Sequence, residues 1–216
     1  MKSYKIILLN LSILILASCA KEGVMRMTTN TFANKEVIPQ GFKAGSSFYI
    51  SAKQKGDELF KKEVSQKIAT ILKNKGFETK NSYYADYHLN FSFAMKKSTH
   101  VRDVPVYIPD YGFWYYNRYH YPYGYDYGYR IAYVPEEYTL FNKILLIEVY
   151  KNGGKIPVWQ GMTDFYEEES DLRNDIDYLL VTLFKYFGQD TKKYVKTRIN
   201  EDDEEVRILR QEYFQQ

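Results

Sequence analysis

Cysteine is the residue type in this sequence whose position points most directly to a chemical reaction. Cys19 is the single cysteine, and it follows two lysines, an apolar stretch over residues 6–16 and the small residues Ala17 and Ser18. This order matches the bacterial lipobox, in which the cysteine thiol receives a diacylglycerol and a peptidase then cuts the preceding bond. We therefore predict lipidation at Cys19, with signal cleavage between Ser18 and Cys19.

The same N-terminal segment has a second interpretation, an uncleaved anchor helix that carries an incidental cysteine. Its apolar stretch is short for such a helix, because a membrane span needs about 20 residues. Ala20 follows the cysteine, whereas an aspartate at that place usually retains Gram-negative lipoproteins in the inner membrane. We expect a protein of the cell envelope that is lipid-anchored in the outer membrane and faces the periplasm.

The other residues that could do chemistry are not arranged for catalysis or metal binding. The three histidines, His88, His100 and His120, do not form a zinc-type pair. No serine lies in a nucleophile-elbow motif, and no glycine-rich loop has phosphate-binding spacing. The acidic run at residues 167–171 could attract a cation but is more typical of a solvated helix N-terminus. We predict no catalytic residue, metal or cofactor; an enzyme with an unrecognised site is the alternative.

Composition favours a single exported domain. A lipidated Cys19 leaves no thiol for a disulfide, so the domain must be held together by its core. The remaining chain of about 200 residues is long enough to form one. The net charge of +3 gives no case for a nucleic-acid partner.

Tyrosine is unusually frequent, with 23 in the chain, and about half of them lie between residues 107 and 138. Turn-forming residues separate many of them, which predicts a hairpin insert over about residues 101–138 with an irregular tip. Grouped tyrosines can bind a cell-wall glycan or an envelope protein; the alternative is a low-complexity loop without a specific ligand. The candidate binding surface consists of Tyr119, Tyr121, Tyr123, Tyr125, Tyr127 and Tyr129.

Hydrophobic periodicity predicts the elements that would position these residues. Strands are expected at residues 46–51, 86–95, 140–150 and 155–166, and amphipathic helices at residues 57–75 and 170–187. Ser170 is the expected N-cap of the second helix, Trp159 is expected in the core, and His88 on a solvated strand face. This order favours an α+β fold: a two-layer sandwich of a mostly antiparallel sheet with both helices on one face and the Tyr-rich hairpin inserted.

The predicted domain organisation follows from these elements. Residues 1–18 are the signal peptide, 19–44 the lipidated cysteine and a polar tether, and 45–188 the α+β domain. Residues 189–216 are expected to be a polar, acidic tail that packs loosely or is disordered.

Several short motifs resemble one known family. A helix ends in Leu72-Lys-Asn-Lys-Gly-Phe77, a strand opens with Ala85-Asp86, and a later hairpin contains Val158-Trp-Gln-Gly161. These motifs are similar to those of the bacterial lipoproteins of domain of unknown function 4136, from about residue 46 to residue 188. The resemblance implies a small α+β envelope domain with no known catalytic residues. We expect a non-catalytic binding or scaffolding role, with an assembly factor for an envelope complex as the alternative.

Overall fold

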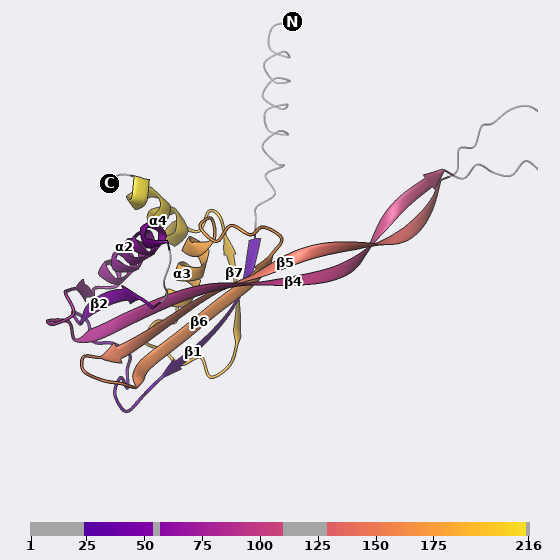
Figure 1. Ribbon diagram of the computed structural model, residues 1–216. Coiled ribbons are helices and arrows are strands. Elements are labelled where there is room, and N and C mark those ends of the chain that lie inside the picture. Colours follow the sequence, from indigo (N-terminus) through magenta and orange to yellow (C-terminus); the bar gives the residue numbers. More distant parts are fainter. Residues whose placement is uncertain (1–23, 54–56, 110–128, 215–216) are drawn as a thin grey trace, which may run out of the picture. The chain divides into compact units, whose positions relative to one another are not determined.

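The computed structural model describes residues 24–53, 57–109 and 129–214, and these residues form a mixed α+β fold (Figure 1). No helix among them is long and apolar enough to span a membrane. The α+β class is therefore confirmed. The elements in chain order are β1 (Val24–Ala33), β2 (Ser47–Ala52), α2 (Glu58–Asn74), β3 (Glu78–Thr79), β4 (Tyr87–Pro109), β5 (Tyr129–Lys151), β6 (Pro157–Glu167), α3 (Ile176–Phe184), β7 (Val195–Asn200) and α4 (Glu204–Phe214).

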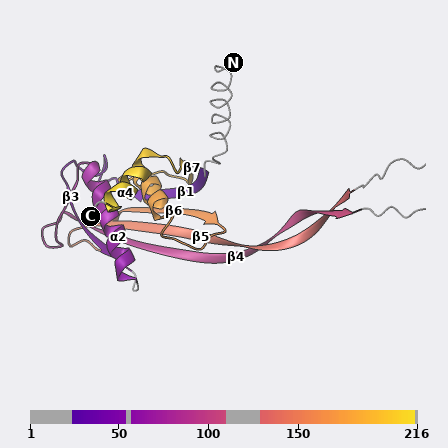
Figure 2. The same ribbon diagram turned by 90° about the horizontal axis from the view of Figure 1, so that it is seen from above.

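The strands form a seven-stranded sheet in the order β3-β2-β4-β5-β6-β1-β7. β1 is antiparallel to both β6 and β7, whereas β2 is parallel to both β3 and β4. The parallel pairs arise because β2 is connected to β3 and β4 through α2, and such a crossover brings the chain back in its original direction. Figures 1 and 2 show the helices gathered over one side of the sheet.

The chain divides into two compact units, and β4 and β5 contribute to both. Unit 1 comprises the residues up to Met95 together with Lys143–Phe165 and Asp171–Gln216. Unit 2 comprises Lys96–Asn142 and Tyr166–Ser170.

Unit 1 has a hydrophobic core between α2, α3, α4 and the sheet. α2 begins at the N-cap Asp57, whose carboxylate accepts a hydrogen bond from Phe60 N at 3.0 Å. It is followed by Gly76, whose φ of 82° suits glycine at the end of a helix.

Trp159 lies in the hydrophobic core of unit 1, as predicted, with 1% of its surface exposed. The buried face of α2 carries Phe60, Val64, Ile68 and Leu72, and it packs in one cluster with Leu89, Phe91, Leu145, Ile147 and Val149 of the sheet.

β1 lies within residues 19–44, which we predicted to be the lipidated cysteine and a polar tether. That prediction is wrong for residues 24–33, which form a strand of the sheet. β1 has a buried face in which two of the inward residues are threonines, Thr29 and Thr31. Their hydroxyls are satisfied, because Thr29 Oγ1 donates to Thr163 Oγ1 at 3.0 Å and Thr31 Oγ1 donates to Gln189 O at 2.9 Å. A buried strand face made with threonine does not show the apolar alternation on which the prediction depended.

The predicted loose tail is also wrong, because it contains β7 and α4. β7 pairs with β1 along its full length, from Val195 to Asn200. Ile199 of β7 and Val206 and Leu209 of α4 are buried in the core of unit 1. Three well-spaced apolar residues are enough to fix this segment because the sheet edge and the other helices supply the rest of the contacts.

The second predicted helix begins later than expected, at Ile176 rather than near Ser170. Residues 171–175 instead form a turn around the ammonium group of Lys143, which is fully buried. Lys143 Nζ donates to Asp171 O at 2.9 Å and forms an ion pair with the Asp175 carboxylate. A buried cation needs such partners, so the backbone of this segment turns toward it rather than continuing the helix.

Unit 2 consists mainly of residues 96–109 of β4 and 129–142 of β5, which we call the ribbon. Three contacts show that its strands are antiparallel: Ser98 Oγ donates to Leu140 O, the ring centroids of His100 and Tyr138 lie 5.7 Å apart, and Arg102 forms an ion pair with Glu136. The ribbon extends beyond the predicted insert of about residues 101–138, because it also includes residues 96–100 of β4 and 139–142 of β5. The predicted irregular tip lies outside the described residues.

Candidate functional site

Most of the site residues predicted from the sequence lie outside the described residues. This applies to Ser18 and Cys19 and to the tyrosines from Tyr119 to Tyr127. Tyr129 is the first residue of β5. Two surfaces among the described residues remain as candidates, the ribbon and a pocket in unit 1.

The ribbon exposes large apolar side chains from both of its strands. Tyr133, for example, has 69% of its surface exposed. Isolated exposed apolar residues are common, but a group of them on one small element makes that element a candidate interaction surface. The exposed members are Val101, Val106, Tyr107 and Ile108 of β4 and Ile131, Tyr133 and Val134 of β5.

Ion pairs and ring contacts near its middle hold the ribbon together. Arg102 Nε donates to Glu136 at 3.0 Å, and its Nη1 donates to Glu168 at 3.2 Å. The guanidinium of Arg102 also lies over the ring of Tyr138, 4.9 Å from its centroid. The hydrogen bond to Glu136 raises the pKa of Arg102 above its usual value. These contacts fix the strand register in a two-stranded element that would otherwise be marginally stable.

Prolines within the ribbon limit how another chain can bind it. Pro105 lies in β4 and Pro135 in β5, and neither has a backbone N–H to donate. Prolines of this kind discourage the addition of a further strand at an open edge. The side chains of the ribbon, rather than its backbone edges, are therefore the surface available to a partner.

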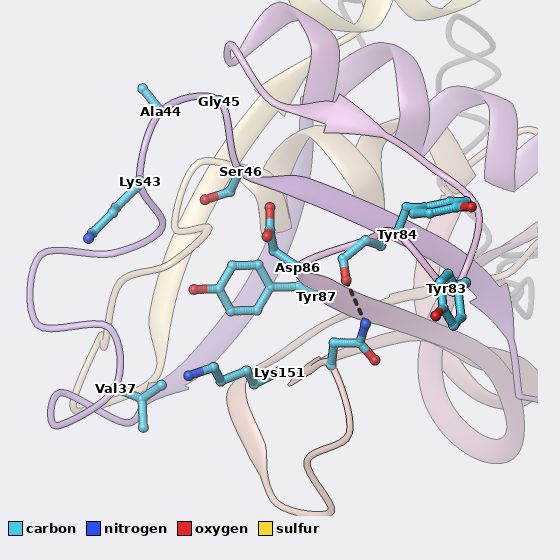
Figure 3. Close-up of a pocket in the computed structure, with 12 residues that line it drawn as sticks. Val37, Lys43, Ala44, Gly45, Ser46, Tyr83, Tyr84, Asp86, Tyr87 and Lys151 are labelled. Carbon is cyan, nitrogen blue, oxygen red and sulfur yellow. Dashed lines mark hydrogen bonds between the residues drawn. The ribbon is translucent and has the colours of Figure 1, made fainter.

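The second candidate is a pocket of about 750 Å³ in unit 1, beside the start of β4 (Figure 3). Residues 43–46 form one wall, residues 83–87 form another, and Lys151 and Asn152 close it at the end of β5. The Asn152 side chain donates to Ala85 O at 2.9 Å, and Asn152 N donates to Asp86 O at 2.9 Å. These hydrogen bonds hold residues 83–87 to the end of the pocket formed by Lys151 and Asn152.

Asp86 joins the start of β4 to the start of β2. Its Oδ2 accepts hydrogen bonds from Ser47 N at 2.8 Å and Ser47 Oγ at 2.7 Å, and Asp86 N donates back to Ser47 Oγ at 3.0 Å. These hydrogen bonds lower the pKa of Asp86, with a smaller contribution from the charge of Lys80. The Asp86 carboxylate is therefore charged at neutral pH, and its Oδ1 has no hydrogen-bond partner among the described residues.

Three tyrosines of residues 83–87 border the pocket. Tyr83 and Tyr84 meet edge to face with ring centroids 4.9 Å apart, and Tyr83 has 81% of its surface exposed. Asn81 fixes the turn that carries them, because its carbonyl accepts from Ala85 N and its side chain accepts from Tyr84 N. Tyr87 stacks on Phe48 at 5.4 Å, and burial raises the pKa of its hydroxyl.

Other polar residues of unit 1 connect its elements. His88 is half-buried rather than fully solvated, and its Nε2 is 3.0 Å from Ser82 O. Lys67 bridges Asp177 and Glu63 at 2.7 and 2.8 Å, which ties α2 to α3. Among the described residues, no group of three or more His, Cys, Asp or Glu side chains is placed to hold a metal ion.

Sequence reasoning identified Ala85-Asp86 only as a motif at the start of a strand. The pairing of Asp86 with Ser47 was missed, although a serine and an aspartate at the starts of two strands are a recognisable signal for side-chain-to-backbone hydrogen bonds. The pocket was missed because its walls are brought together by the parallel pairing of β2 and β4, which the sequence did not predict.

Comparisons with known structures give remote similarities. One is to a PDZ domain protein from Parabacteroides distasonis, with 13% identity and a TM-score of 0.45, covering 88% of this chain and 42% of that chain. This chain therefore spans less than half the length of that protein. Another is to the PelC dodecamer from Paraburkholderia phytofirmans, with 10% identity and a TM-score of 0.40, covering 76% of this chain and 99% of that chain.

No curated protein matches this chain. The model of a protein family, the domain of unknown function (DUF4136), matches residues 29–187, which include the second half of β1 and extend past the end of α3. This agrees with the resemblance of the three motifs. Because the match covers most of the sequence, the protein belongs to the DUF4136 family.

Proposed function

We propose that this protein is a non-catalytic binding or scaffolding module of the bacterial cell envelope, anchored in the outer membrane through lipid on Cys19. The lipobox sequence supports the anchor. The single observation that carries the binding role is the ribbon, which exposes large apolar side chains on both of its strands. The partner that best fits these side chains is an envelope protein.

The exposed apolar side chains of the ribbon are unfavourably hydrated. Exposed valine, isoleucine and tyrosine side chains add little to the stability of unit 2, and each would gain about 25 cal/mol per Å² when covered by an apolar partner. Aromatic residues such as Tyr107 and Tyr133 are enriched at protein interfaces because they bury much area with little loss of side-chain entropy. A protein partner would gain both from burying this apolar area and from the small loss of side-chain entropy.

The finer architecture belongs to the same proposal. We infer that unit 1 is a two-layer sandwich that serves as a stable base, and that the ribbon continues into the Tyr-rich hairpin that contains Tyr119 to Tyr127. The ion pairs of Arg102 would keep the ribbon stiff enough to present its side chains.

Photo-crosslinking in cells tests the binding role. A photoreactive amino acid at Ile131 or Tyr133 of the full-length chain is expected to capture a discrete envelope protein. The same probe at Lys62, an exposed residue of α2, serves as the matched control. Equal labelling at the ribbon and at Lys62, or none at the ribbon, would count against the proposal.

Metabolic labelling with a fatty acid tests the anchor separately. The wild type is expected to incorporate the label, and Cys19→Ser is expected to lose it while its domain stays folded. Incorporation of the label into Cys19→Ser would refute lipidation at this residue.

A further inference from the structure

We propose that the pocket in unit 1 is a binding site for an acidic saccharide, a sugar that carries a carboxylate group. The proposal goes beyond the ribbon and uses none of its residues; it rests on the proposed envelope location only for access to such sugars. Four features of the pocket support it: its size, its charge, its exposed aromatic rings and its free acceptor.

The size and lining of the pocket suit a small polar ligand. Its volume of about 750 Å³ lies in the range of about 300–1,000 Å³ that is typical of small-molecule sites. The pocket is open to solvent and lined largely by polar groups, which favours a hydrated ligand such as a sugar over an apolar one.

The charges of the lining residues favour a negatively charged ligand. Lys43 and Lys151 line the pocket, and neither has a carboxylate partner among the described residues. Asp86 is the single carboxylate of the lining, so the two ammonium groups leave a net positive charge. Figure 3 shows both ammonium groups toward the same end as the Tyr87 hydroxyl, where they could bind a carboxylate.

The opposite end of the pocket has the rings of Tyr83 and Tyr84 (Figure 3). Two exposed tyrosines on a turn held by Asn81, with their rings edge to face, present an aromatic surface at this end. Such a surface can cover the apolar C–H face of a sugar ring, while the tyrosine hydroxyls remain hydrated. An anion without a sugar ring would gain nothing from this end.

Asp86 lies between these two ends and supplies an acceptor for sugar hydroxyls. Its Oδ2 is used by Ser47, but its Oδ1 is free of partners among the described residues. A hydroxyl that donates to this charged oxygen forms a strong hydrogen bond. Glycoside hydrolysis generally requires two carboxylates, and the lining has one, so the pocket lacks the pair that a hydrolase of this kind uses.

Calorimetric titration of the full-length lipidated protein in detergent micelles tests the proposal with three probes. Trigalacturonate has both sugar rings and carboxylates, tri-N-acetylchitotriose has rings without charge, and citrate has carboxylates without a ring. We expect trigalacturonate to bind at least about tenfold more tightly than either of the others, because only it can use both ends of the pocket.

Matched variants locate the site. Lys151→Gln and Tyr84→Ser are each expected to weaken trigalacturonate binding about tenfold. Lys62→Gln and Tyr194→Ser, which alter exposed residues outside the lining, are expected to leave it unchanged. Circular dichroism of each variant verifies that it is folded.

Three results would overturn the proposal: no binding of trigalacturonate by folded wild type, equal binding of citrate, or equal loss in the control variants. Failure here is distinguishable from failure of the proposed function. The pocket variants leave the ribbon unchanged, so crosslinking at Tyr133 should persist in them whatever the titrations show.

Discussion

The two units of this protein use the same two strands in opposite ways. In unit 1, Leu145, Ile147 and Val149 of β5 are fully buried. In unit 2, Ile131 and Tyr133 of the same strand are largely exposed. Both stretches carry large apolar side chains at alternate positions, so these side chains alone do not explain the difference. The neighbours do: in unit 1 the sheet is covered by helices, and unit 2 contains no helix among its described residues.

Within β5, the residues that stabilise the fold are therefore separate from the residues that another molecule can reach. Buried apolar residues stabilise unit 1 and are not accessible to another molecule. Exposed apolar residues in unit 2 add little to stability, and this leaves them available for binding. Substitutions in the two units should therefore affect different measurements.

The largest contrast is expected between a core aromatic residue and a ribbon aromatic residue. Trp159→Ala should lower the free energy of unfolding by about 3–5 kcal/mol, because it removes a buried ring and leaves a cavity. Tyr133→Ala should change it by less than about 0.5 kcal/mol. Denaturant unfolding of the full-length protein measures both, and similar losses would contradict the division of roles.

A nearly equal effect is expected from the buried cation of unit 1. Lys143→Met should lower the free energy of unfolding by about 3–5 kcal/mol, because it leaves the Asp175 carboxylate buried without its cation. The double variant Lys143→Met with Asp175→Leu should recover much of this loss. Lys97→Met, on the exposed ribbon, is the control; a loss as large as that of Lys143→Met would contradict the argument.

A smaller effect is expected at Gly161, where a Cβ would overlap the Trp159 ring and lie 2.8 Å from Leu183 Cδ1. Gly161→Ala should lower the free energy of unfolding by about 1–3 kcal/mol through overpacking. The smaller ring of Trp159→Phe should relieve the overlap, so the double variant should lose less than the sum of the single variants. Strict additivity, measured by denaturant unfolding, would exclude this contact as the cause.

The smallest effect is expected at Asp86, and it should depend on pH. The folded state lowers the pKa of Asp86, so its stabilising contribution is present at neutral pH and is lost as pH falls through the folded-state pKa. Asp86→Asn should lower the free energy of unfolding by about 1 kcal/mol at pH 7, a value reduced by solvent exposure. The difference from wild type should vanish in strong acid, whereas Asp103→Asn on the ribbon should show no difference at either pH.

The sequence predicted the parts of the fold that have clear apolar periodicity. Leu89 and Phe91 in β4, Phe60 to Leu72 in α2 and the position of Trp159 are examples. It did not predict β1, because Thr29 and Thr31 occupy buried positions and are satisfied by hydrogen bonds to residues more than a hundred positions away. Nor did it predict the start of α3, which depends on where the Lys143 ammonium group lies.

The candidate site was less predictable than the fold. The sequence indicated a hairpin where the ribbon lies. Its side chains are exposed because β4 and β5 extend beyond the part of the sheet that the helices cover. The pocket depends on Lys43, Tyr84 and Lys151, which come from three separate segments. These three residues lie close together because of the strand order in the sheet, which no local sequence pattern predicts.

The position of β1 between β6 and β7 has a consequence for when the protein can fold. β1 is synthesised before every other strand of the described chain, but its partners, from Pro157 onward and from Val195 onward, are among the last residues made. Its side of the sheet cannot be completed until almost the whole polypeptide is available. For a chain that we propose is exported, this order means that β1 can complete its pairing only after the C-terminal strand has also been exported.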